Sequence, residues 1–171
     1  MLRIPVNTHD QKQGNMNASL QLVEFGDYEC PHCGAAHPVV KELQRYFGNG
    51  LLFVFRNFPL SGIHPIAYPA AQVAEAAGLQ HKFWPVHDMI FENQQDLSIQ
   101  NLFRYADVKT VNREQLIVQM NSQKIIEKIE MDIESGARSG VNGTPTFFIN
   151  GKRYDGDYEF ETMRDFLAGL L

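Results

Sequence analysis

The sequence predicts an α/β domain that is interrupted by a run of helices. Residues 20–25 and 51–58 have the apolar composition of buried strands. Between them, residues 36–47 place apolar side chains along one face of a helix. Strand, helix and strand in this order form a βαβ unit, so the two strands should be parallel and their crossover right-handed.

The middle of the chain is predicted to be helical. Apolar side chains recur at helical spacing in successive segments, and two of these segments begin at good capping residues, Ser98 and Asn112. The expected helices cover residues 66–79, 83–91, 98–106, a stretch after 112, and 126–136.

A β-hairpin and a final helix are expected after these helices. Residues 146–149 form an apolar strand, Asn150-Gly151 favours a type I′ turn, and residues 152–154 begin the return strand. The last segment has a helical apolar face, with Asp157 as its expected N-cap. The chain therefore divides into a core of residues 1–61 and 126–171, with residues 1–14 as an N-terminal extension, and an inserted helical subdomain at 62–125.

Composition narrows the classes of function. The formal net charge is −5, and no run of Lys and Arg is present, which argues against a nucleic-acid partner or an anionic membrane surface. No stretch approaches eighteen apolar residues, and residues 1–19 lack the apolar core of a signal peptide. We expect a cytoplasmic monomer, or an exported protein whose signal has been removed.

The two cysteines, Cys30 and Cys33, are the chain's whole cysteine inventory. A disulfide between them would close a very small loop and add little stability, so its purpose should be chemical. Cys30 stands where a strand ends and a helix begins, and a helix N-terminus stabilises a thiolate. Cys33, one turn further along the helix, could resolve a mixed disulfide formed on Cys30.

The two residues between the cysteines fit this chemistry. Pro31 suits the first turn of a helix, where its missing N–H costs nothing. His32 would favour the charged sulfur through its imidazolium or N–H group, which makes the disulfide a stronger oxidant. A zinc site at a CxxC pair would need two further ligands, and no second CxxC exists.

A second signal is Gly143-Thr144-Pro145-Thr146-Phe147. Proline cannot donate to a strand ladder, so Pro145 should stand at the first position of the strand or in a turn. Taken with the upstream CxxC, the segment looks like a loop with a cis-proline that faces the dithiol, since a cis bond costs little only before proline.

These motifs resemble the DsbA-like branch of the thioredoxin superfamily. The residues that carry the resemblance are VEFGDYECPHC at 23–33, FRNFPL at 55–60 and SGVNGTPTFFING at 139–151. With the helical insertion, the resemblance covers nearly all of residues 15–171. It implies a thioredoxin-like fold with a helical insertion and a thiol–disulfide oxidoreductase activity.

The resemblance also implies roles for individual residues. Cys30 becomes the attacking nucleophile and Cys33 the buried resolving thiol. Thr144 and the cis-proline Pro145 would bind an extended substrate peptide through the backbone. Glu24 matches a buried acid beneath the active site that exchanges a proton with Cys33, although a strand glutamate facing solvent is the alternative.

The direction of electron flow stays open in the sequence. The CPHC turn favours an oxidase, whereas Thr144 is more familiar from reductase and isomerase relatives. We expect no cofactor beyond the Cys30–Cys33 pair and no bound metal. Protein or peptide thiols and disulfides would be the substrates, with a redox partner protein or glutathione. Two alternatives are a metal-binding or metallochaperone module that uses Cys30 and Cys33, and a glutathione-linked transferase of the kappa type.

Overall fold

The computed structural model describes all 171 residues and contains a five-stranded mixed sheet with strand order β1-β3-β2-β4-β5. The central strands, β2 and β3, are parallel, and the other pairings are antiparallel. The predicted βαβ unit and hairpin are therefore confirmed. The strands are β1 (Gln11–Gly14), β2 (Leu20–Gly26), β3 (Leu51–Asn57), β4 (Thr146–Ile149) and β5 (Lys152–Tyr154).

Strand β1 is an element that the sequence does not predict. It lies inside the segment that we assigned as an N-terminal extension and pairs with β3 at one edge of the sheet. Its sequence, QKQG, has no apolar alternation, and none of its residues is fully buried. Its hydrogen bonds to β3 hold it in place, and a pairing of that kind leaves no local pattern in the sequence.

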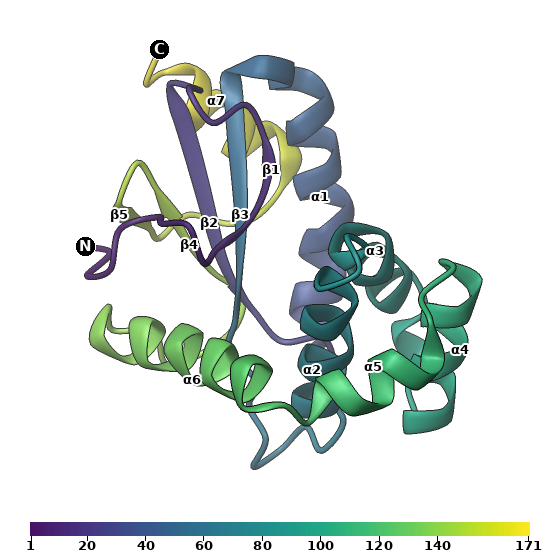
Figure 1. Ribbon diagram of the computed structural model, residues 1–171. Coiled ribbons are helices and arrows are strands. Elements are labelled where there is room, and N and C mark those ends of the chain that lie inside the picture. The colour runs from purple at the N-terminus through teal and green to yellow at the C-terminus, as the bar shows by residue number, and fades with distance from the viewer.

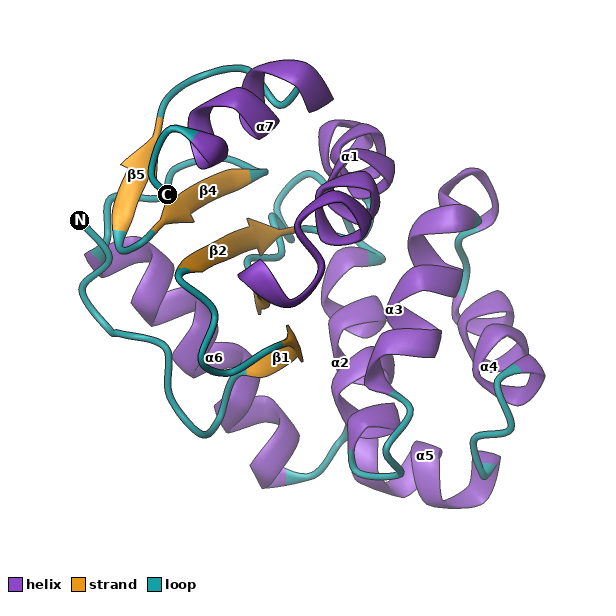
Figure 2. Cartoon of the chain, turned by 90° about the horizontal axis from the view of Figure 1, so that it is seen from above, coloured by secondary structure: helices purple, strands orange, loops and turns teal.

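The helices form layers around this sheet. Figure 2 shows α1 and α7 over one face and α6 across the other. Helices α2 to α5 gather beside the sheet, on the right of Figure 1. The bounds are α1 (Pro31–Phe47), α2 (Ala67–Gly78), α3 (Phe83–Glu92), α4 (Ile99–Val108), α5 (Arg113–Met120), α6 (Gln123–Arg138) and α7 (Phe160–Ala168), with short 3₁₀ turns η1 (Gly48–Gly50) and η2 (Gln94–Asp96).

The helix caps follow the sequence in two of three cases. The side chains of Ser98 and Asn112 accept hydrogen bonds from backbone N–H groups at the starts of α4 and α5, as expected. The expected cap Asp157 is wrong. Helix α7 begins at Phe160 and its N-cap is Glu159, while an Asp157 oxygen accepts a 3.3 Å hydrogen bond from the Glu159 N–H in the turn before the helix.

Side chains along β2 point alternately to the two faces of the sheet, and this alternation determines which of them face helix α1. Leu20 and Leu22 are fully buried in the same cluster as residues of α1 and α7. Val23 and Phe25 belong to a second cluster on the opposite face, which α6 covers. Because successive strand residues point to opposite faces, Glu24 shares the face of Leu20 and Leu22 and points toward α1.

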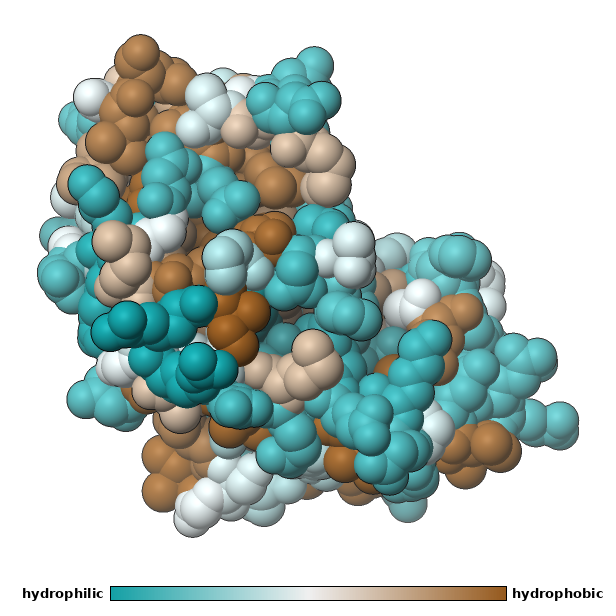
Figure 3. Space-filling model, turned by 60° about the vertical axis from the view of Figure 1, so that its left-hand side comes forward, coloured by the Kyte–Doolittle hydropathy of each residue, from teal (hydrophilic) through white to brown (hydrophobic).

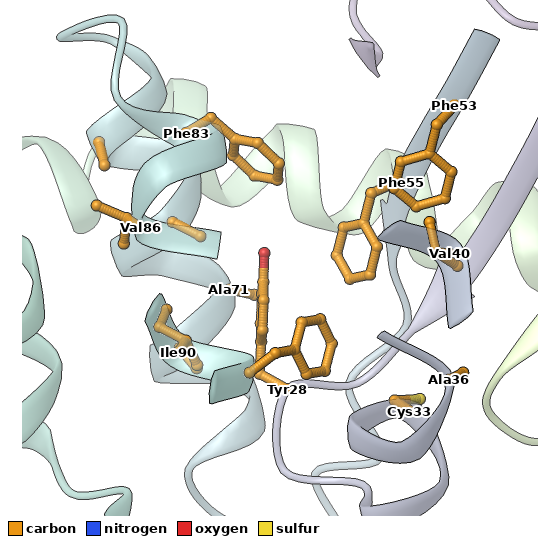
Figure 4. Close-up of a cluster of buried hydrophobic side chains, with 14 of the residues drawn as sticks. Tyr28, Cys33, Ala36, Val40, Phe53, Phe55, Ala71, Phe83, Val86 and Ile90 are labelled. Atoms are coloured by element: carbon orange, nitrogen blue, oxygen red, sulfur yellow. The ribbon is translucent and has the colours of Figure 1, made fainter. Parts of the chain in front are cut away.

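An aromatic cluster connects the sheet with the helices beside it. Tyr28 extends from the segment after β2 into a group of buried side chains between α1, α3 and β3 (Figure 4). Its ring centroid lies 5.3 Å from that of Phe55 and 4.8 Å from that of Phe91. Cys33 lies at the edge of the same cluster, so the buried half of the dithiol is part of the core.

The outer surface mixes polar and apolar side chains without one dominant apolar face in the view of Figure 3. None of the helices combines the length and the apolar character that a membrane crossing requires.

A buried ion pair ties the N-terminal segment to the sheet. Arg56 on β3 is 1% exposed, and its Nε and Nη2 donate to the two carboxylate oxygens of Asp10 at 2.8 and 2.9 Å. Its Nη1 donates to the Ser135 hydroxyl of α6 at 2.8 Å. The guanidinium thus joins three segments that are distant in sequence.

We predict that Asp10→Ala lowers the free energy of unfolding by about 3 kcal/mol, because it leaves a buried guanidinium without its anion. Asp165→Ala, which removes an exposed partner of Arg164, should leave the stability almost unchanged. Urea unfolding followed by circular dichroism measures both. Equal effects in the two variants would contradict the role given to Arg56.

Candidate active site

The Cys30–Cys33 turn is built at the start of α1. Cys30 is the N-cap residue with extended backbone angles, and Pro31 occupies the first helical position. The backbone N–H of Gly34 donates to the carbonyl of Cys30 at 3.1 Å, which closes the first turn. Both cysteines are free thiols; Cys30 is 4% exposed and Cys33 is fully buried.

The surroundings of Cys30 favour its thiolate. A hydrogen bond from the Cys33 thiol contributes most, and hydrogen bonds from Thr144 and from the backbone N–H groups of Cys33 and His32 add to it. Burial works in the opposite direction. The net result lowers the pKa of Cys30 from 9.0 to about 5, so the reactive form predominates at neutral pH.

Cys33 has the opposite character. Burial raises its pKa well above 9.0, and its hydrogen bond to Cys30 and the nearby Glu24 carboxylate raise it further. The backbone N–H of Asp27 lies 3.5 Å from the Cys33 sulfur, which partly offsets these effects. One thiol of the pair is therefore ionised at neutral pH and the other stays protonated.

Glu24 is a buried acid on the face of the sheet that carries α1. It is 2% exposed, and its Oε1 has no hydrogen-bond partner. Burial raises its pKa from 4.5 to about 8, with a smaller contribution from the charge of Cys30. A side chain at Gly26 would place its Cβ 2.5 Å from the Phe55 ring and 3.1 Å from Glu24 Oε1, so glycine leaves the room that this carboxyl needs.

The Thr144-Pro145 peptide bond, which is cis, brings the loop before β4 to the dithiol. The Cys30 thiol donates to the Thr144 carbonyl, with 3.5 Å between sulfur and oxygen. The Thr144 hydroxyl is buried and has no other hydrogen-bond partner. It is thus available to donate to the sulfur once Cys30 ionises.

Tyr158 and Gln94 are among the residues of the site that the sequence analysis did not name. The Tyr158 hydroxyl lies 2.9 Å from Nδ1 of His32, and the Gln94 side chain donates to the carbonyls of Tyr28 and Cys30 at 3.0 and 2.6 Å. Both reach the turn from remote segments. No local motif marks either residue, and only the fold reveals them.

Asp27 and His64 form a polar pair at the base of the turn. Asp27 is 1% exposed, and its Oδ1 accepts hydrogen bonds from the N–H groups of Glu29 and Cys30. Its Oδ2 accepts from the Leu60 N–H at 2.9 Å and lies 2.8 Å from His64 Nδ1. The hydrogen bond to Asp27 raises the pKa of His64, although burial opposes it.

The candidate site residues named from the sequence thus lie close to one another at the start of α1. The turn consists of Cys30, Pro31, His32 and Cys33. The Thr144 carbonyl accepts a hydrogen bond from Cys30, and the charge of Glu24 interacts with the two sulfur atoms. The structure's cluster of three metal-ligating side chains, His37, His87 and Asp88, contains neither cysteine.

Removing the Thr144 hydroxyl should weaken the thiolate. We predict that Thr144→Val raises the pKa of Cys30 by about one unit, the equivalent of one hydrogen bond to a charged group. The ultraviolet absorbance of the thiolate, titrated in the reduced protein, measures this pKa. Thr162→Val, at an exposed position of α7, is the matched control and should leave it unchanged. An unchanged pKa in Thr144→Val would contradict the assignment.

Neutralising Glu24 should change how stability depends on pH. A pKa raised from 4.5 to about 8 stabilises the fold fully below pH 4.5, and this contribution is lost as the pH rises through 8. In the disulfide form, we expect wild type to lose at least about 2 kcal/mol relative to Glu24→Gln between pH 4.5 and 8. Urea unfolding at several pH values measures this difference, and parallel curves would contradict the burial of an ionisable carboxyl.

Comparison with known sequences identifies the family of this chain. The family model described as thioredoxin matches residues 7–168. The Na⁺/H⁺ antiporter NhaA 1 of Mycolicibacterium vanbaalenii is 38% identical over 161 residues, which are 93% of this chain and 26% of the antiporter. The chain spans about a quarter of the length of the curated relatives it matches.

Solved structures agree with the family. A thioredoxin-like oxidoreductase from Silicibacter pomeroyi matches with a TM-score of 0.82 and 25% identity, covering 93% of this chain and 90% of its own. The thiol–disulfide exchange protein α-DsbA2 of Wolbachia pipientis matches with a TM-score of 0.86 and 22% identity, covering 96% and 89%. The chain belongs to the thioredoxin family and has the DsbA-like form of the thioredoxin fold.

Proposed function

We propose that this chain is a thiol–disulfide oxidoreductase that oxidises dithiols of proteins or peptides through Cys30 and Cys33. A substrate thiolate attacks the Cys30 sulfur of the disulfide form, the Cys30–Cys33 bond breaks, and Cys33 leaves. A second substrate thiolate then attacks the substrate sulfur of the mixed disulfide and expels Cys30. The substrate gains a disulfide, and the protein accepts two electrons as its dithiol.

The observation that carries this proposal is the contrast between the two thiols. Cys30, with a pKa lowered to about 5, is a good leaving group in the second step. A stabilised thiolate also favours the reduced form of the protein, so its disulfide takes up electrons readily. This supports the oxidase direction among the directions that the sequence left open.

Glu24 is the proton donor that we assign to the first step. Cys33 leaves as a thiolate in a buried place where its pKa is well above 9.0, so it must gain a proton as it leaves. A carboxyl with a pKa of about 8 is protonated at neutral pH and lies on the same face of the sheet. In this proposal Glu24 gives its proton to Cys33 and recovers it when the disulfide forms again.

Recognition of the substrate would use the loop around Pro145. We propose that the backbone of Thr144 and Pro145 pairs with an extended peptide next to Cys30. Backbone pairing of this kind accepts many peptide sequences. A redox partner protein or glutathione would then restore the Cys30–Cys33 disulfide.

The reduction potential of the pair tests the direction. In glutathione redox buffers we expect a value more positive than about −200 mV, nearer the roughly −120 mV typical of a strong oxidant than the roughly −270 mV of a reductant. A value near the reductant end would overturn the oxidase direction. Failure to form any reversible disulfide would overturn the oxidoreductase proposal as a whole.

Single cysteine variants test the two roles. Cys30→Ser should lower dithiol oxidation of a model peptide at least a thousandfold, because the attacked sulfur is missing. Cys33→Ser should instead attack oxidised glutathione through Cys30, release one reduced glutathione, and accumulate a Cys30–glutathione mixed disulfide that mass spectrometry detects. An adduct at Cys33 in the Cys30→Ser variant, formed at the same rate, would reverse the assigned roles.

A further inference from the structure

A cluster of metal-ligating side chains lies between α1 and α3, apart from the dithiol. His37 comes from α1, and His87 and Asp88 come from α3. One ligand atom from each of the three lies within 4.8 Å of the others. His37 is 7% exposed and His87 is 1% exposed, so both imidazoles are removed from water.

The His37 side chain has an unsatisfied nitrogen that points into this cluster. Its Nε2 is buried, has no hydrogen-bond partner, and lies 3.7 Å from Oδ1 of Asp88. An unpaired polar atom in the interior is costly, and buried groups of this kind call for a partner. A metal ion bound between this nitrogen and the carboxylate would give His37 the partner that it lacks.

His87 has a hydrogen bond of the kind that supports metal-binding histidines. Its Nδ1 lies 2.8 Å from the Tyr28 hydroxyl, a hydrogen bond that fixes the ring and leaves Nε2 as the nitrogen that can bind an ion.

The Lys41 ammonium pairs with the carboxylate that a metal ion would bind at this cluster. Its ammonium lies 2.8 Å from Oδ1 of Asp88, the same oxygen that faces His37. The Lys41 side chain is 28% exposed, so it can swing into water and release the carboxylate. His37 and Lys41 also line a surface cavity of about 430 Å³, so this cavity reaches one of the three side chains of the cluster.

We propose that His37, His87 and Asp88 form a binding site for a divalent transition-metal ion, with Zn²⁺ as the best match, and that water fills the fourth position. Two imidazoles and a carboxylate are ligands that Zn²⁺ prefers. Bonds of about 2.0–2.2 Å in a tetrahedral site place the ligand atoms roughly 3.3 Å apart. The three ligand atoms, which lie within 4.8 Å of one another, would therefore have to approach by up to about 1.5 Å to close on an ion.

The inference is independent of the proposed redox function, because neither cysteine takes part. An ion at this place would bridge α1, which carries the dithiol, to α3 in the group of helices beside the sheet. It would also lock Tyr28, whose hydroxyl bonds His87 and whose backbone carbonyl accepts a hydrogen bond from Gln94.

Zinc binding by the disulfide form tests the proposal, since oxidation removes Cys30 and Cys33 as ligands. Competition with a chromophoric zinc chelator should show one ion bound per chain. His37→Gln and Asp88→Asn should each weaken the affinity at least tenfold. His9→Gln and Asp96→Asn, both at exposed positions, are the matched controls and should not change it.

Lys41→Met adds a test that misfolding cannot imitate. By removing the competing ammonium, this variant should bind zinc at least tenfold more tightly than wild type. Co²⁺ bound to the same protein should show the visible absorption of a site with four ligands, and that absorption should be lost in His37→Gln. Binding by the reduced protein alone, or affinity unchanged in the His37, Asp88 and Lys41 variants, would overturn the proposal.

Discussion

The carboxylate of Asp27 is the point from which the active site is organised. Its two oxygens accept hydrogen bonds from the start of α1, through the Cys30 N–H, and from the segment after β3, through Leu60 and His64. Its own backbone N–H points at the Cys33 sulfur. One buried charge thus fixes the end of β2, the redox turn and the neighbouring loop relative to one another, because a buried carboxylate is stable only when such donors surround it.

Burial raises the pKa of both thiols, and the hydrogen bonds around each sulfur decide which of them ionises at neutral pH. Cys33 and Glu24 have no adequate set of donors, so removal from water keeps both protonated at neutral pH. Cys30 meets several donors at a helix N-terminus, and these outweigh the cost of burying its charge. The site therefore holds a stable thiolate at Cys30 next to two protonated groups, Cys33 and Glu24. The steps that we propose use these side chains and no bound cofactor.

The sequence predicted most of the fold and the centre of the site because both leave local patterns. The CPHC turn at a strand–helix junction and the Thr144-Pro145 pair are readable from neighbouring residues. The hydrogen bond of Tyr158 to His32 joins positions 126 residues apart, and Gln94 reaches Cys30 across 64. Such contacts depend on how the elements pack, and strand β1 depends likewise on pairing with β3. No local pattern could have disclosed them.

The side-chain amide of Gln94 couples the position of α3 to the backbone of the redox turn. It belongs to the short turn after α3, and it holds the carbonyls of both Tyr28 and Cys30. It also lies against Gly34, where any larger side chain would displace it. A rigid-body shift of the neighbouring helices must therefore either carry the nucleophile's backbone with it or break both bonds. A displacement of α3 would therefore act on the backbone of the redox turn through this amide as well as through the bond between Tyr28 and His87.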